Sequence, residues 1–394
     1  MSSTSLDVVR GLSFTLLSDW TTILSLIFGG CCSNALTLEQ ITTEYPYSGS
    51  LITFCQFLVV SLYGLPKFVV WKPYPHLKPR QIPIWPYLVQ VLLFYLISLL
   101  NNAAFGYSIP MTVHIIFRSG GLVVSMLLNW MLLRRRYTIL QVFSVLVVTL
   151  GVVLTTMSAS GPKKQSTSGA IDPLAYAKGI SLMTAALVLG GFLGIVQDRT
   201  YAWYGHRESP GSKSESLAQK SSGPPWQEAM FYLHFLSMPM FYLIRKDIAS
   251  QFRAISTGPK LELSLPAFLL NTNLTPPLIS TFDFGDASVS SGTLTIPTAY
   301  IPLFLNTITQ LFCVSGVHQL SARVSSLTVT LMLVVRKAVS LIISVVLFSG
   351  TGRVPTGMKL IELWAGALLV FGGTVGYSLG GKQRPKAKEK AKQE

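Results

Sequence analysis

Two basic residues stand side by side in the middle of a long apolar segment. Arg336 and Lys337 lie within residues 326–348, which contain no acidic residue. A second apolar segment, residues 109–133, carries Arg118 at a comparable depth. On insertion scales a charge at the bilayer centre costs about 2.5–3.5 kcal/mol, so three such charges cost roughly 8–10 kcal/mol. No acidic residue on the same helices could neutralise these cations. We therefore infer that they bind an anionic ligand. Such a pattern is typical of a membrane carrier for a negatively charged solute.

Polar side chains share a helical face with these basic residues. Their spacing of about four residues places them on one side of each helix, toward a cavity or another helix rather than lipid. We interpret the serines mainly as hydrogen-bonding contacts between helices. Arg336 and Lys337 are interpreted as ligand-binding residues, whereas Arg118 could equally bind backbone carbonyls at helix ends. These polar faces comprise His114, Arg118, Ser125 and Asn129 in residues 109–133, and Thr328, Arg336, Ser340 and Ser344 in residues 326–348.

Amide, imidazole and hydroxyl groups also occur inside other apolar runs. Side chains of these types could hydrogen-bond a nucleotide base or a sugar. With His114, they complete the set of candidate substrate-binding residues beside the three basic ones. They are Gln56, Asn101, Asn102, Tyr300, Asn306 and Gln310. His318 also lies in an apolar run but is not part of this set.

The composition is that of an integral membrane protein. Half of the 394 residues are hydrophobic, only 12% are charged and the mean hydropathy is +0.49, whereas soluble domains carry about 25% charged residues. We predict an all-α protein whose apolar stretches are each long enough to cross a bilayer core of about 30 Å. The first stretch lacks a small-residue cleavage site and is expected to be retained. The ten predicted spans are residues 18–39, 49–70, 84–104, 108–133, 138–158, 173–197, 226–244, 296–320, 324–349 and 357–380.

The distribution of Lys and Arg predicts the orientation. Most of them fall in the N-terminus, the tail and the loops on the same side, including Arg134 to Arg136. Because cytosolic loops carry the excess of positive charge, both termini are expected to face the cytosol. The net charge of +15 is then mostly an orientation signal. Nucleic acid is not an expected partner, because no basic stripe interleaves with aromatic residues on a soluble surface.

Similarity between two segments of the sequence predicts that the protein consists of two related halves. Residues 117–125 and 335–343 share an apolar pattern around a central Arg, and a Gly-rich span follows each. Two five-helix halves would have opposite orientations, which places a substrate site near the midplane between them. The alternative is that apolar helices with one Arg merely look alike. The predicted order is a cytosolic N-terminus (1–17), a first repeat (18–158), a luminal linker (159–172), a second repeat (173–380) with a luminal insertion (245–295), and a cytosolic basic tail (381–394).

Motifs for ATP hydrolysis and zinc binding are missing from the sequence. No phosphate-binding Gly-x-x-x-x-Gly-Lys-Ser/Thr motif or zinc-binding His-Glu-x-x-His motif is present, and only 16 residues are acidic. We therefore expect a secondary transporter rather than an enzyme, without cofactor or metal. The four cysteines, Cys31, Cys32, Cys55 and Cys313, match no disulfide framework and are expected to pack as small residues. Asn273 is a candidate glycosylation site, although Pro276 disfavours its use.

Short motifs spread over most of residues 29–349 resemble a known family. They are Gly29-Gly-Cys-Cys-Ser-Asn34 with Leu38-Glu39, Thr53-Phe-Cys-Gln-Phe57, Asn101-Asn102, His114-Ile-Ile-Phe-Arg-Ser119, Gln197-Asp198, Asn306-Thr-Ile-Thr-Gln310, and Ser326-Leu-Thr-Val-Thr330 with Arg336-Lys337. In combination they resemble the nucleotide-sugar transporters specific for UDP-N-acetylglucosamine, of the drug/metabolite transporter superfamily. No single motif is specific. Residues 200–225 and 245–295 look longer than the family pattern, and no function carries over to them.

The resemblance implies a fold and a transport reaction. It implies ten transmembrane helices in two inverted five-helix repeats, and exchange of a cytosolic UDP-sugar for luminal UMP without ATP or metal. The basic pair on the ninth helix, Arg336 and Lys337, would contact the phosphates. Xylose and galactose remain alternatives to N-acetylglucosamine. Other interpretations are a carrier of another phosphorylated metabolite, such as a sugar phosphate, and a membrane receptor or assembly factor that transports nothing.

The tail suggests a location. Lys390 and Lys392 lie five and three positions from the carboxyl end, a spacing that resembles the dilysine signal read by the retrograde vesicle coat. We therefore expect the endoplasmic reticulum membrane, with the Golgi membrane as the alternative. A basic tail that only satisfies the positive-inside rule would look the same.

Overall fold

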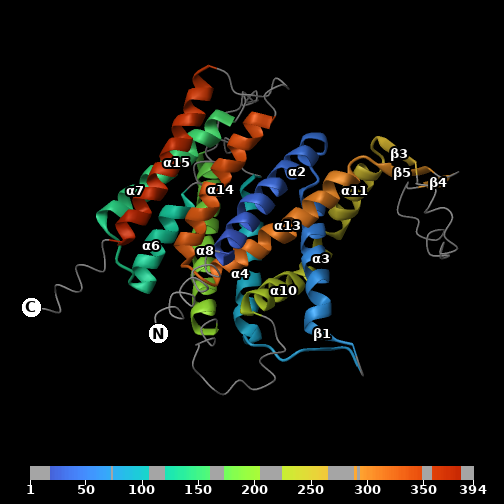
Figure 1. Cartoon of the computed structure of the whole chain (residues 1–394), viewed down its shortest axis with the longest axis horizontal. Coiled ribbons are helices and arrows are strands. Elements are labelled where there is room, and N and C mark those ends of the chain that lie inside the picture. Colours follow the sequence, from blue (N-terminus) through green and yellow to red (C-terminus); the bar gives the residue numbers. More distant parts are fainter. Residues whose placement is uncertain are drawn as a thin grey trace, which may run out of the picture. The chain divides into compact units, whose positions relative to one another are not determined.

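The structure is a computed structural model that describes residues 18–71, 74–105, 120–159, 173–204, 224–264, 288–290, 293–347 and 357–382. It is helical, with short strands confined to connections (Figure 1). The described elements are η1 (Leu26–Gly30), α2 (Cys31–Glu44), α3 (Gly49–Phe68), β1 (Val69–Val70), β2 (His76–Leu77), α4 (Ile84–Phe105), α6 (Gly121–Leu133), α7 (Ile139–Ala159), α8 (Pro173–Tyr204), α10 (Pro225–Ser237), η3 (Met238–Ile244), α11 (Arg245–Ser256), β3 (Lys260–Ser264), β4 (Ser288–Ser290), β5 (Thr293–Pro297), α13 (Tyr300–Ser321), α14 (Ser326–Leu347) and α15 (Met358–Lys382).

Among the described residues, seven helices are long and apolar enough to cross a membrane. They account for seven of the ten predicted spans. The other three correspond to α6, to α10 continued by η3, and to α14. The prediction of a multi-pass helical membrane protein is thus confirmed, and ten helices fit the structure. The inverted five-helix repeat stays a prediction.

The chain forms two compact units, and each unit combines early and late segments. The first unit comprises Met1–Leu77 and Met230–Gly316. The second comprises Lys78–Ala229 and Val317–Glu394. The chain therefore passes between the units three times, after residues 77, 229 and 316. The second of these connections lies inside α10 and the third inside α13.

In the first unit, helix α13 packs tightly against η1 and α2. A Cβ atom at Gly30 would lie 2.8 Å from the backbone N of Cys313, and one at Gly316 would lie 2.8 Å from the Cβ of Leu26. The close approach brings Cys31 and Cys313 into a disulfide across 282 residues of sequence. The expectation that all four cysteines are unpaired packing residues was wrong for these two. Sequence spacing could not reveal the pair, because only the helix crossing brings the cysteines together.

The luminal insertion predicted at 245–295 contains ordered structure. Helix α11 packs on α3, and Ile255 is fully buried in a cluster with Leu51 and Ala299. Strands β3, β5 and β4 form a small antiparallel sheet in the order β3-β5-β4. The side chain of Gln251 accepts a hydrogen bond from the backbone N of Leu51, at 2.8 Å. The start of this insertion is therefore part of the first unit rather than a loose loop.

In the second unit, α7 and α15 lie side by side (Figure 1). A Cβ atom at Gly151 would lie 2.6 Å from the carbonyl O of Gly366, and one at Gly366 would lie 2.7 Å from the carbonyl O of Gly151. Small residues at such crossings allow helix backbones to meet in a membrane, where helix association depends on close packing. The Gly-rich spans noted in the sequence thus correspond to this contact.

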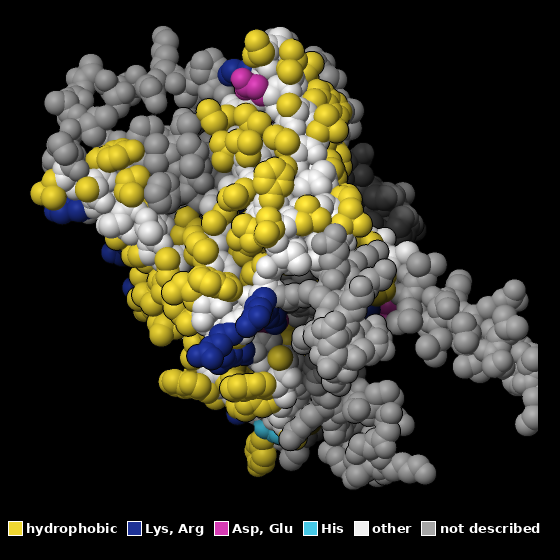
Figure 2. All heavy atoms as spheres, turned by 90° about the vertical axis from the view of Figure 1, so that its left-hand side faces the viewer, with side chains coloured by type: hydrophobic (Ala, Val, Ile, Leu, Met, Phe, Trp, Pro, Cys, Tyr) yellow, Lys and Arg dark blue, Asp and Glu magenta, His cyan; other side chains and the backbone are white. Residues whose placement is uncertain are grey.

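The outer faces of α7 and α15 are strongly apolar. Ile139 and Leu368 are 90% and 72% exposed, and Phe143 and Ile361 are similarly exposed. Figure 2 shows a wide hydrophobic surface on one face of the molecule, interrupted by a compact group of Lys and Arg side chains. A surface of this kind suits contact with lipid acyl chains, so it supports the membrane assignment.

Buried polar groups hold the start of α10 against the start of α4 in the second unit. The carboxylate of Glu228, which is 1% exposed, accepts hydrogen bonds from the backbone N of Gln81 at 2.8 Å and of Ile82 at 3.0 Å. The hydroxyl of Tyr87 donates a third at 3.2 Å. A buried carboxylate is tolerated when donors surround it in this way. The contact fixes the segment that leads into α4.

Candidate binding cavity in the second unit

Helices α4, α6, α8 and α14 line a cavity inside the second unit that is mainly apolar and carries a few polar groups. It has a volume of about 240 Å³ and is lined by Asn101 of α4, Ser125 of α6 and Thr330 of α14, with Gly190 and Gly191 of α8 on the opposite wall. Gly190 leaves room for this space, since a Cβ atom there would meet nothing within 4 Å, whereas Gly191 allows Leu128 to pack closely on α8. Hydroxyl and amide groups on an otherwise apolar wall can orient a polar ligand.

A second cavity of about 180 Å³ shares Gly190 and Thr330 with the first. It extends along α8 to Gln197 and Asp198, and Ser326 lines it from the start of α14. The Oγ atom of Ser326 is buried and has no hydrogen-bond partner within the described part of the chain. This hydroxyl is therefore available to a ligand in the cavity.

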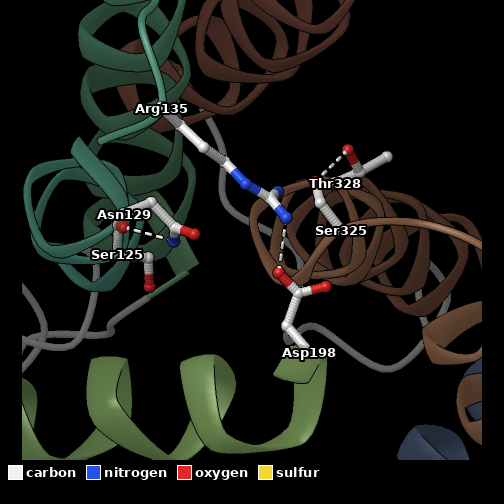
Figure 3. A network of polar contacts seen from close by, with 6 residues as sticks. All are labelled: Ser125, Asn129, Arg135, Asp198, Ser325 and Thr328. Carbon is white, nitrogen blue, oxygen red and sulfur yellow. Dashed lines mark hydrogen bonds and ion pairs between the residues drawn. The ribbon is translucent and has the colours of Figure 1, made fainter. Parts of the chain in front are cut away.

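An ion pair lies at the end of this second cavity. Arg135 Nη2 contacts the Oδ2 atom of Asp198 at 2.8 Å (Figure 3). The Arg135 side chain is 38% exposed and that of Asp198 is 12% exposed. Arg134, the residue that ends α6, adopts a left-handed conformation with φ of 49° and turns the chain before Arg135. The backbone N–H of Ser326, at the start of α14, also interacts with the Asp198 carboxylate.

Sequence reasoning did not select Arg135 or Asp198 as site residues. Asp198 appeared only within a family motif, and Arg135 appeared only as part of a cytosolic basic cluster. A signal was present, because Asp198 is an acidic residue inside an apolar helix and acidic residues there are costly. The partner could not be identified from the sequence, since 63 positions separate the two residues.

The basic pair lies on α14, the helix that lines both cavities. Arg336 is half-buried, with a buried Nε atom, and Lys337 is exposed. Lys337 is seven positions beyond Thr330, so it lies on the same face of the helix about 10 Å further along. The cavity-lining hydroxyls and Lys337 therefore follow one face of α14, and Arg336 lies beside that face.

Of the other predicted site residues, Gln56 and Asn306 bond to each other in the first unit. Gln56 Nε2 donates to Asn306 Oδ1 at 2.7 Å. Asn306 Nδ2 donates to the carbonyl O of Asn34 at 3.0 Å and to Thr37 Oγ1 at 3.1 Å, while Asn34 Nδ2 donates to the carbonyl O of Asn306 at 2.8 Å. Asn306 is fully buried. These contacts join α13 to α2 and α3, which is the role expected of polar residues between membrane helices.

The structure places the remaining candidates at separate positions. Asn101 lines the first cavity and donates through Nδ2 to the carbonyl O of Ile97 at 2.9 Å. The hydroxyl groups of Tyr300 and Ser256 are 2.8 Å apart, and Gln310 is half-buried on α13. Nδ1 of His318, which is outside the candidate set, lies 2.9 Å from the hydroxyl of Tyr201. Outside the described residues are His114, Arg118, the side chain of Asn102, the glycosylation candidate Asn273, and Lys390 and Lys392 of the tail.

The first unit has a more open groove of about 500 Å³. It follows η1, where the first span makes a π-helical turn, and is lined by Thr21, Ser25, Gly29 and Ser33 with Thr309 of α13. π-Helical turns are frequent at functional sites. Among the described residues that line this groove none is charged, so it is less suited to phosphate than the region around Arg135.

Comparisons with known proteins agree with the helical membrane fold. The model of the UAA transporter family matches residues 20–381. The chain is 33% identical over 368 residues to the UDP-N-acetylglucosamine transporter of Saccharomyces cerevisiae, which covers 90% of this chain and 93% of that protein. It is 30% identical to the UDP-xylose and UDP-N-acetylglucosamine transporter of Danio rerio (90% and 92% covered). It is 33% identical to the endoplasmic reticulum GDP-fucose transporter of Drosophila melanogaster (89% and 87% covered).

Proposed function

Because this chain belongs to the UAA transporter family, whose members are membrane carriers, we propose that it exchanges a cytosolic UDP-sugar for luminal UMP. UDP-N-acetylglucosamine is the first candidate, because relatives in two yeasts carry that substrate in their names. UDP-xylose and GDP-fucose are the competing candidates, since the relatives from Danio rerio and Drosophila melanogaster are named for them.

The observation that carries the proposal is the composition of one helix face. Ser326 and Thr330 of α14 line the second cavity, and Lys337 lies further along the same face with Arg336 beside it. Hydroxyls suit a sugar or a base, and a guanidinium with an ammonium suits phosphate oxygens. A nucleotide sugar carries both kinds of group. UMP and a UDP-sugar carry about the same negative charge, so their exchange moves little net charge.

The test is uptake of radiolabelled nucleotide sugar into proteoliposomes. Vesicles preloaded with UMP should take up UDP-N-acetylglucosamine, and vesicles without UMP should take up much less. UDP-xylose, UDP-galactose, GDP-fucose and a hexose phosphate are compared in the same vesicles. Preference for the hexose phosphate would favour a carrier of sugar phosphates, and no uptake of any compound would favour a receptor or assembly factor.

Arg336 and Lys337 are the proposed phosphate ligands. Arg336→Ala and Lys337→Ala should each abolish or greatly weaken uptake while the protein still inserts and folds. Lys337→Arg keeps the charge with different donor geometry and should retain part of the activity. Lys359→Ala, on α15, is a matched loss of one positive charge and should leave uptake close to that of the wild type. Unimpaired uptake in both α14 variants would refute the assignment.

We also propose an endoplasmic reticulum location with both termini in the cytosol. A cysteine introduced at position 75, 135 or 215 should react with an impermeant thiol reagent added to sealed cytosol-side-out vesicles, and one at 165 or 265 should not. Changing Lys390 and Lys392 to Ser should shift a tagged protein toward the Golgi. An unchanged location would mean that the tail is only a charged end.

A further inference from the structure

The carboxylate of Asp198 is bound by two groups that are also good phosphate donors. One is the guanidinium of Arg135, whose Nη2 lies 2.8 Å from Oδ2 of Asp198. The other is the backbone N–H of Ser326, the first residue of α14. Guanidinium groups bind phosphate oxygens strongly, and the start of a helix offers free N–H groups together with the positive end of its dipole. The surroundings of Asp198 therefore form an anion-binding position that a side chain of the protein occupies.

This position opens to the cavity that we assign to the ligand. Asp198 and Ser326 both line the second cavity, together with Thr330. The Oγ atom of Ser326 and the Oδ1 atom of Asn129 are buried and lack hydrogen-bond partners among the described residues. Figure 3 shows the Asn129 amide and the Arg135 side chain coming from the same end of α6, with Asp198 facing Arg135 from α8. Of these two atoms only the Ser326 hydroxyl can donate to an anion, because an amide oxygen accepts hydrogen bonds.

The two partners of the ion pair differ in their freedom to move away. Arg135 follows the left-handed turn at Arg134 and is 38% exposed, whereas Asp198 is 12% exposed and lies inside helix α8. An ion pair with one exposed partner gains little over the hydrated ions, so a competing anion can replace the carboxylate. The guanidinium can then remain in place or rotate toward the competitor.

We propose that Arg135 is a further phosphate-binding residue and that Asp198 is its internal substitute for the ligand. This inference rests on the proposed function. In the empty carrier, Asp198 neutralises Arg135 and receives the N–H of Ser326. When a nucleotide first enters the cavity, a phosphate replaces the Asp198 carboxylate on Arg135, and the Ser326 hydroxyl donates to the same phosphate. Arg336 and Lys337 lie about 15 Å further along α14 and would bind the phosphates at a later step of transport. When the nucleotide leaves, Asp198 returns, so the empty site never holds an unpaired cation.

The test compares KM and kcat for UDP-N-acetylglucosamine uptake into UMP-loaded proteoliposomes. Arg135→Ala should raise KM about tenfold or more with a smaller change in kcat, because a ligand contact is lost. Asp198→Asn removes the competitor and should lower KM about two- to fivefold, as expected for a pair that is partly exposed. Arg136→Ala removes a neighbouring exposed charge of the same kind, and its KM should stay within about twofold of the wild type. Arg135→Lys should lie between wild type and Arg135→Ala.

Several results would overturn this inference. Equal KM values for Arg135→Ala and Arg136→Ala would show that the net positive charge of this region, rather than a contact of Arg135, affects binding. A lower kcat at constant KM in Arg135→Ala would show that Arg135 acts in the conformational cycle rather than in ligand binding. A higher KM in Asp198→Asn would mean that the carboxylate helps to bind the ligand. If Asp198→Asn fails to fold, Asp198→Glu replaces it, because a longer carboxylate changes the geometry of the pair, and an unchanged KM in that variant would refute the competition between Asp198 and the ligand.

Failure of the proposed function can be recognised separately. If the wild type takes up no nucleotide sugar, binding of UMP to the purified protein is measured by tryptophan fluorescence with the same variants. Weaker UMP binding in Arg135→Ala alone would then support the anion site although the exchange reaction is wrong. Absence of both uptake and UMP binding would overturn both proposals.

Discussion

Replacing Asn306 by Ala should destabilise the protein rather than act on substrate recognition. The change removes three side-chain hydrogen bonds, to the carbonyl O of Asn34, to Thr37 Oγ1 and from Gln56 Nε2. Hydrogen bonds between membrane helices average about 0.6 kcal/mol, so their loss amounts to about 2 kcal/mol. Asn306 is fully buried, and water therefore cannot easily replace the lost partners. For a cooperative unit of 150–250 residues this corresponds to a melting temperature lower by about 4–8 °C.

The assay is thermal unfolding of the purified protein in detergent, followed by size-exclusion chromatography with fluorescence detection. Gln310→Ala is the matched control, because Gln310 is a half-buried amide one turn further along α13. It should change the melting temperature by less than the Asn306 variant. Asn306→Asp keeps an acceptor for Gln56 but loses both donors, and should be at least as unstable as Asn306→Ala.

The decisive outcome is a separation of stability from transport. Asn306→Ala could instead have the melting temperature of the wild type but take up no nucleotide sugar. Asn306 would then bind the substrate, and its assignment as a residue that joins helices would be refuted. A lower melting temperature, with uptake restored on cooling, would support a helix-joining role.

Three more predictions concern contacts inside the units. Non-reducing peptide mapping should recover a fragment that joins Cys31 to Cys313, and Cys313→Ser should lower the melting temperature, with a cost of about 2–4 kcal/mol; two free thiols at these positions would contradict the structure. Gly366→Leu should force α7 and α15 apart and cost at least about 1–3 kcal/mol, whereas Gly372→Leu, where a Cβ meets nothing within 4 Å, should be tolerated in the same melting assay. Glu228→Gln replaces an oxygen that accepts buried N–H groups by a donor and should cost about 2 kcal/mol; an unchanged melting temperature would show that this carboxylate does not hold the α4 segment.

The sequence was sufficient to predict the class of the protein and the positions of most helices. Length and hydropathy decide these features locally, because each span must satisfy its own backbone hydrogen bonds in lipid. The described helices fall within or close to the predicted spans, except α11, which lies in the predicted luminal insertion. The family resemblance also rested on local motifs, and the family comparison confirms it.

The contacts between helices could not be predicted in this way. Gln56 and Asn306 were expected to read the substrate, but 250 positions of sequence separate two side chains that hydrogen-bond to each other. The disulfide and the Arg135–Asp198 pair depend in the same way on which helices cross and where. The amino-acid sequence therefore determined which polar groups enter the membrane. Only the tertiary structure decided which of them satisfy one another and which face a cavity, because helix packing brings distant residues within hydrogen-bonding distance.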